Sequence, residues 1–128
     1  MWLFIETTQP DRFTVGLLGG TAPKLREVQA RSHAVNTEVF RQLTPSVRKQ
    51  LDGICVVSGP GSFTSTRTGV IIANLLSRQY TRPLVGVSFD EAQDLEALTA
   101  RLVSGIQKTV SYVAPVYSSE PNITIATC

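Results

Sequence analysis

One stretch of the chain, ICVVSGPGSFTSTRTGVIIANLL at residues 54–76, constrains the fold more than any other. Residues 54–58 are apolar almost throughout, which is typical of a central strand covered on both faces. The glycines and proline at 59–61 predict a sharp turn, and the following segment predicts a helix over about 65–78. A buried strand followed by a turn and a helix indicates an α/β fold.

The remaining pattern extends this unit to a single domain. Residues 1–7 and 13–18 read as an antiparallel hairpin, and residues 25–30 alternate like a half-exposed third strand. A first helix is predicted over 33–43, with Pro45 just past its end. A short strand follows at 84–87. The order is β-β-β-α-β-α-β-α, which predicts a mixed five-stranded sheet with flanking helices in one domain spanning 1–128.

Two details refine the last third of the chain. Ser88 and Glu91 fit a capping box ahead of a third helix that carries Ala92 to Val103 and stops at Gly105. Residues 110–117 are expected to form a last strand or extended segment, and the tail after them has no clear assignment.

Composition excludes several classes of function. The net charge is +2 and the densest basic stretch is Arg48-Lys49, so a basic stripe for nucleic acid is not indicated. Two cysteines do not form a disulfide framework, and we expect a reduced, cytoplasmic protein. The first residues resemble neither a signal peptide nor a membrane span.

The turn at 59–61 has three possible interpretations. A phosphate site at the start of the helix would use its free N–H groups, but the P-loop Lys is missing and Thr64 breaks the dinucleotide fingerprint. A nucleophile elbow at Ser62 lacks the flanking glycines and would need His33, the single histidine, as its base. The turn can also be purely structural, and no metal site or cofactor is indicated.

The helix after the turn is apolar on every side over residues 69–76, with Asn74 as its one polar residue. A helix on a sheet normally shows one apolar stripe and one polar face. One face therefore covers the sheet, and the other is covered either by the first helix or by another chain. The sequence leaves these two alternatives open.

The segment SGPGSFTSTRTGV at 58–70 resembles the signature of the TsaB (YeaZ) family. The match includes Arg67, Gly69 and the signature turn, which consists of Gly59, Pro60, Gly61, Ser62, Phe63 and Thr64. It departs from the signature at Ser65, Thr66 and Thr68. The segments LFIETT, SHAVNTEVFRQL, PLVGVSFDEAQ and APVYSS resemble other family segments in the correct order.

The resemblance implies an actin/Hsp70/sugar-kinase-like (ribonuclease H-like) fold in a minimal member that lacks the family's second domain. It implies a non-catalytic scaffold subunit, not an enzyme, that binds TsaD and acts with TsaE in threonylcarbamoylation of adenosine 37 in tRNA, without a cofactor. It further implies a homodimer when the chain is alone. TsaD binds metal through a His-x-x-x-His motif, which this chain lacks.

In this family the first two helices form the docking surface. The resemblance therefore assigns the partner and dimer interface to His33, Val35, Val39, Phe40, Leu43, Thr66, Arg67, Val70, Ala73 and Asn74. A charge at Val70 or Ala73 is expected to abolish association without unfolding the chain. Ser62 or Thr64 is expected to cap the second helix. Glu6 ends the first strand where the family has Asp.

Two alternatives remain beside the scaffold function. One is a small nucleotide-binding or hydrolase-like protein that uses the turn at Gly59 to Thr64. The other is a homodimer that has lost the modification role.

Overall fold

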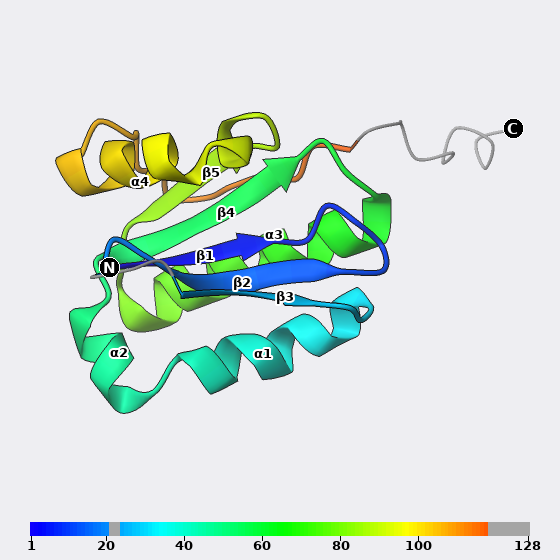
Figure 1. Cartoon of the computed structure of the whole chain (residues 1–128), viewed down its shortest axis with the longest axis horizontal. Coiled ribbons are helices and arrows are strands. Elements are labelled where there is room, and N and C mark those ends of the chain that lie inside the picture. The colour runs from blue at the N-terminus through cyan, green and yellow to red at the C-terminus, as the bar shows by residue number, and fades with distance from the viewer. Residues whose placement is uncertain (21–23, 118–128) are drawn as a thin grey trace, which may run out of the picture.

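A computed structural model describes residues 1–20 and 24–117 and shows a mixed five-stranded sheet flanked by helices (Figure 1). The strand order is β3-β2-β1-β4-β5. The antiparallel strands β1, β2 and β3 form a meander, and β4 and β5 run parallel to β1. The strands span Trp2–Glu6 (β1), Phe13–Leu18 (β2), Lys24–Val28 (β3), Gly53–Gly59 (β4) and Leu84–Ser88 (β5). The predicted fold class is confirmed.

Helices cover both faces of this sheet. They span Ser32–Ala34 (η1), Val35–Gln42 (α1), Pro45–Gln50 (α2), Phe63–Tyr80 (α3), Glu91–Gln93 (η2) and Leu95–Ser104 (α4). Helix α2 was not predicted, because Pro45 was read as the residue that follows a helix. Pro45 instead begins α2, and the Thr44 side chain caps it by accepting a hydrogen bond from the Val47 N–H at 3.3 Å.

The predicted capping box forms, but it caps a shorter element. The Ser88 N–H donates to Glu91 Oε1 at 3.0 Å, and the Glu91 N–H donates to Ser88 Oγ at 3.1 Å. These bonds precede η2, and α4 has its own cap at Asp94, which accepts from the Ala97 N–H at 3.0 Å. The predicted third helix is thus divided in two, and it ends at Gly105 as expected.

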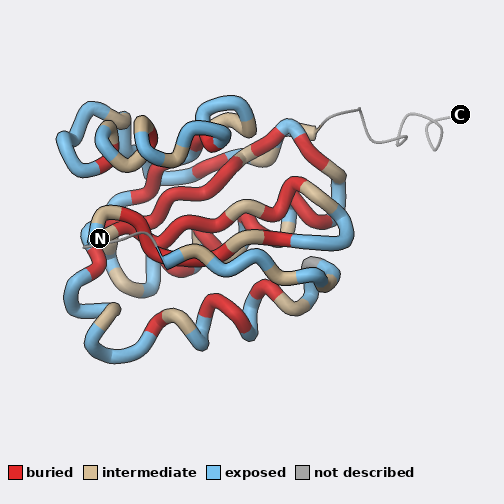
Figure 2. The backbone as a smooth tube through the Cα atoms, in the orientation of Figure 1, coloured by how far each residue is buried: buried red, intermediate tan, exposed pale blue. Residues whose placement is uncertain are grey.

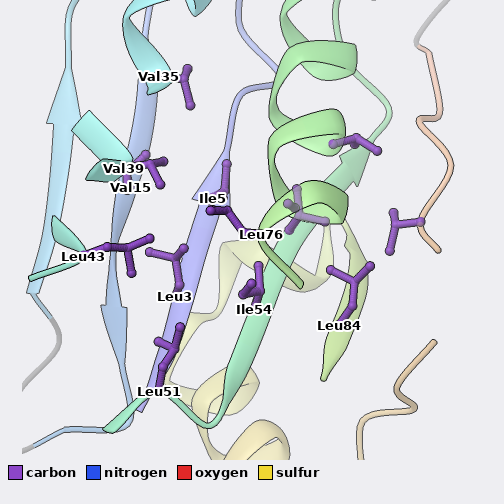
Figure 3. Packing of buried hydrophobic residues seen from close by; sticks show 14 of the residues in the cluster. Leu3, Ile5, Val15, Val35, Val39, Leu43, Leu51, Ile54, Leu76 and Leu84 are labelled. Atoms are coloured by element: carbon purple, nitrogen blue, oxygen red, sulfur yellow. The ribbon is translucent and has the colours of Figure 1, made fainter. Parts of the chain in front are cut away.

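Residues of β1 and β4 are buried along almost the whole of both strands (Figure 2), and the buried side chains form two core layers, one on each face of the sheet. Leu3 and Ile5 of β1 face α1 and α3, where they pack with Ile54 and Leu76 (Figure 3). Trp2 and Phe4 face the opposite side, where Leu98 and Leu102 of α4 complete the second layer. Because β1 and β4 are buried on both faces, each face of the sheet is covered by its own layer of packed side chains.

The segment after α4 closes the fold along the edge strand β5. Val110 bridges to Leu84, and Tyr117 bridges to Gly61 beside the signature turn. The Asn74 side chain holds this segment, because it donates to the Val113 carbonyl and accepts from the Val113 N–H, each at 2.9 Å. The predicted extended segment at 110–117 is therefore present, although it joins the sheet through isolated bridges. The predicted tail lies outside the described residues.

No helix in the part of the chain that the structure describes is long and apolar enough to span a membrane.

Burial makes Cys55 of β4 chemically inert. The side chain is fully buried, and desolvation, with a smaller contribution from Glu91, raises the pKa of the thiol to about 12. In a Cys128→Ser background, we expect Cys55 to resist iodoacetamide at pH 8 and to react once the protein is unfolded in urea, as mass spectrometry would show. Rapid alkylation of the folded protein would contradict this burial.

Candidate functional site

The signature turn lies where β1 and β4 both end, at the carboxyl edge of the parallel part of the sheet. Gly59 has a φ of +129°, and an added Cβ would overlap the carbonyl oxygen of Val116. The peptide bond between Gly59 and Pro60 is cis. The Val116 N–H donates to the Ser58 carbonyl at 2.6 Å, so the turn is fixed against the C-terminal segment.

The two residues after β1 join the turn to the start of α3. Thr7 Oγ1 donates to the Ser65 carbonyl at 2.7 Å, and the Ser62 N–H donates to the Thr8 carbonyl at 2.9 Å. Both threonines are buried. Gly69 lets α3 approach this close, since a Cβ there would overlap Thr7 Oγ1. The glycines of the signature thus allow the loop after β1 and the first turns of α3 to pack in direct contact.

The polar groups at the start of α3 are arranged differently from the expectation. Ser62 occupies the N-cap position, but its hydroxyl contacts Ser65 Oγ and makes no capping bond. Thr64 lies within α3, where its carbonyl accepts from Thr68 Oγ1 at 2.9 Å. Thr66 Oγ1 is buried without a hydrogen-bond partner among the described residues. Neither predicted cap is therefore made by a side chain.

Two cavities open beside the turn. One, of about 280 Å³, is lined by Thr8, Gln9, Pro10, Pro60, Gly61, Ser62 and Phe89. The other has a volume of about 500 Å³, and its lining includes His33, Ser62 and Arg31. No hydrogen bond joins His33 to Ser62 within residues 1–20 and 24–117, although a nucleophile and its base need such contact. The arrangement offers a shallow binding surface and does not assemble a nucleophilic pair.

The carboxylate of Glu6 is fixed at the end of β1. Its Oε1 accepts from the Thr8 N–H at 3.1 Å and from the Thr8 hydroxyl. The side chain lines another cleft on the α4 side of the sheet, which shares Gln9 and Phe89 with the smaller cavity beside the turn. The sequence singled out Glu6 as the acidic residue of the first strand, and the structure shows that Thr8 orients it.

The structure corrects most of the predicted interface. Val35, Val39, Leu43, Thr66, Val70 and Ala73 have 0 to 3% of their surface exposed and belong to the interior of this chain. Their side chains pack between the helices and the sheet, so they cannot contact a partner without unfolding. The prediction that they form an interface is wrong because each helix turns its apolar stripe toward the sheet.

The other predicted interface residues keep accessible side chains. His33, Phe40 and Arg67 are exposed, and Phe40 has 52% of its surface exposed. Asn74 is half-buried, and its side chain is hydrogen-bonded to the backbone of Val113. The sequence missed Ile71 and Leu75, which are exposed on α3 and line a groove of about 560 Å³ with Tyr112. Helical phase was the only signal for them, and it is ambiguous when nearly every position is apolar.

The residues present do not provide the His-x-x-x-His metal site described above for TsaD. The sequence contains one histidine, so it has no His-x-x-x-His motif. Within the described ranges, no group of three or more His, Cys, Asp or Glu side chains is placed to hold a metal ion.

Comparison with known proteins now adds the family. The model of the family "TsaD: tRNA N6-adenosine threonylcarbamoyltransferase" matches residues 7–118. The tRNA N6-adenosine threonylcarbamoyltransferase of Methylobacterium nodulans is 38% identical over 92 residues, which cover 69% of this chain and 25% of that protein. A probable mitochondrial enzyme of the same name from Arabidopsis thaliana is 37% identical over 87 residues, covering 66% of this chain and 17% of that protein. The chain thus spans about a quarter or less of the length of these curated relatives.

The fold comparison matches YeaZ from Pseudomonas aeruginosa, with a TM-score of 0.60, 22% identity, and coverage of 68% of this chain and 43% of that chain. This likeness supports the expected fold, while assignment to TsaB stays a prediction. The expectation that the chain is not an enzyme is contradicted, because its curated relatives are named as the transferase. The family model and these relatives together show that the chain belongs to the TsaD family of tRNA N6-adenosine threonylcarbamoyltransferases.

Proposed function

We propose that this chain acts in the cytoplasm in tRNA N6-adenosine threonylcarbamoylation, as one lobe of a substrate cleft that a TsaD subunit completes. The observation that supports this most is the family match over residues 7–118, which includes the signature turn. The match covers about a quarter of the relative from Methylobacterium nodulans, so these residues correspond to one part of that protein.

The position of the turn supports the same proposal. In open α/β sheets, ligands bind beyond the carboxyl ends of parallel strands, where successive connections diverge. The chain leaves β1 toward β2 and leaves β4 toward α3, so the cavity lined by Thr8, Gly61 and Ser62 lies at such a point. Half of a substrate site at this edge would contact the nucleoside or the donor group, and TsaD would cover it.

The exposed side of α1 and α3 is the surface that we assign to the partner. Phe40, Ile71 and Leu75 are large apolar residues with 44 to 59% of their surface exposed. Arg67 is exposed on α3, and its guanidinium forms no ion pair or hydrogen bond with another described residue. The interface we propose therefore differs from the sequence-based one, since it uses the outward residues of the same two helices.

Light scattering after size-exclusion chromatography tests this association. We expect the chain to form a complex with TsaD from the same cell, and Phe40→Asp to weaken the complex at least tenfold because it places a charge in the interface. Val103→Asp is the matched control, since Val103 is 64% exposed on α4 at the other face of the sheet.

Three outcomes would contradict the proposal. The first is a chain that does not bind TsaD. The second is a homodimer that TsaD does not dissociate. The third is a complex with TsaD that Phe40→Asp and Val103→Asp weaken equally. A role of TsaE is tested by adding that protein to the same mixture. The alternative of a hydrolase-like protein is not favoured, because His33 and Ser62 are not hydrogen-bonded.

A further inference from the structure

A cleft of about 240 Å³ opens on the α4 side of the sheet, next to the cavity at the signature turn, with which it shares Gln9 and Phe89. Its apolar wall comes from Phe4 of β1 and from Ala92 and Leu95 near the start of α4. Leu18 of β2 packs in the core layer beneath α4, whereas Thr14 of β2 and Glu27 of β3 lie on the same face of the sheet and line the cleft. Its volume is below that of sites for drug-sized ligands, which indicates a small metabolite.

Two carboxylates line one side of this cleft. The strand register places Glu6 opposite Thr14 and Thr14 opposite Glu27, so the three residues form a row across β1, β2 and β3. Neighbouring Cβ atoms in such a row lie about 5 Å apart. The backbone N–H and the hydroxyl of Thr8 donate hydrogen bonds to Oε1 of Glu6, while Oε2 accepts no hydrogen bond from the described residues. The row therefore presents carboxylate oxygens that are available to a ligand.

A positive group lines the same cleft. Arg12 lies two residues before Thr14 and is exposed, and its guanidinium forms no ion pair or hydrogen bond with any residue in the described ranges. Elsewhere in the molecule such charges do pair, as Arg26 and Glu38 do at 3.5 Å. The cleft thus keeps its positive and negative groups apart, which is complementary to a ligand whose own opposite charges are separated.

We propose that this cleft binds a small aliphatic α-amino acid as a zwitterion. Arg12 would bind the carboxylate, because a guanidinium pairs with a carboxylate through two parallel hydrogen bonds. Glu6 and Glu27 would accept hydrogen bonds from the ammonium group, and the aliphatic side chain would pack against Phe4, Ala92 and Leu95. The cleft adjoins the cavity lined by Thr8, Gly61 and Ser62, with which it shares Gln9 and Phe89. The inference rests on the charged and apolar lining of the cleft itself, and binding to the chain alone tests it without TsaD or tRNA.

Isothermal titration calorimetry with three probes tests the proposal on the full chain. L-valine carries both charges, N-acetyl-L-valine lacks the ammonium, and L-valine methyl ester lacks the carboxylate. We expect saturable binding of L-valine and binding of each analogue at least tenfold weaker. Absence of L-valine binding, or an ester that binds as tightly as L-valine, would overturn the proposal without any need for a variant.

Two conservative substitutions locate the site. Arg12→Gln and Glu6→Gln should each weaken L-valine binding at least tenfold, and the side-chain amide introduced by Glu6→Gln retains an oxygen that can accept from Thr8. Arg12→Gln should also remove the preference for L-valine over its methyl ester, which a general loss of structure would not do selectively. Lys49→Gln, which removes one positive charge at an exposed lysine on α2, is the control and should bind like the native chain. Unchanged binding in both cleft variants would place the ligand elsewhere and refute the assignment.

Discussion

Replacing Val70 by Glu is expected to unfold the protein. Val70 is 1% exposed and packs in the layer between α3 and the sheet, where the described members of the core cluster are apolar and would not pair with a new carboxylate. An unpaired buried charge costs several kcal/mol, and the total stability of a small domain is only about 5–15 kcal/mol. Urea denaturation followed by circular dichroism should show little or no folded protein.

The matched substitution is Leu75→Glu on the same helix. Leu75 is 59% exposed, so its replacement should change the free energy of unfolding by about 0.5 kcal/mol or less. A folded Val70→Glu variant that failed to associate would restore the original expectation that Val70 faces a partner. The two variants together therefore test which side of α3 faces the sheet, a question that the sequence left open.

Gly69→Ala is expected to destabilise the protein strongly, although it adds only one methyl group. An added Cβ would overlap Thr7 Oγ1, and the Thr7 hydroxyl already donates to the Ser65 carbonyl at 2.7 Å. Relief of the overlap must break this hydrogen bond or move α3 away from β1. We expect a loss of about 3 kcal/mol in the free energy of unfolding, measured by urea denaturation.

A second substitution shows whether the overlap is the cause. Thr7→Ala removes both side-chain atoms nearest to the added methyl group, Oγ1 and Cγ2. In the double variant the two substitutions should be strongly non-additive, with a coupling of about 1–2 kcal/mol. Simple additivity of the two losses would mean that Gly69 is needed for another reason.

The sheet could be predicted because its strands carry clear local signals. The apolar run at 54–58 and the alternation at 25–30 correspond to β4 and β3. Helix α2 was hidden because a proline fits both the end of one helix and the first turn of the next. Only the cap at Thr44 distinguishes the two, and a threonine before a proline is too common to decide the matter.

The candidate site could be predicted only in part. The signature turn was located from its glycines and proline, and Glu6 from its place at the end of a strand. The buried contacts of Thr7 and Thr8 with α3 could not be foreseen, because they join residues more than 50 positions apart in sequence. The cleft at Arg12 also depends on strand register, since only the pairing of β1, β2 and β3 aligns Glu6 with Glu27.

The chemistry of the family was harder to judge than its fold. The turn resembles the TsaB signature, while the family model and the curated relatives belong to TsaD. Related subunits share one core architecture, and function then depends on residues grafted onto it. A short signature in a shared fold therefore identifies the superfamily better than it identifies the subunit.

The most direct test of the proposed function measures N6-threonylcarbamoyladenosine in tRNA. Purified TsaD and TsaE, a threonylcarbamoyl donor and unmodified tRNA would be incubated with and without this chain, and digested nucleosides quantified by mass spectrometry. The proposal predicts that the chain raises the yield severalfold, that Phe40→Asp removes the increase, and that Val103→Asp preserves it. A yield that is the same with and without the folded chain would contradict a role in this modification.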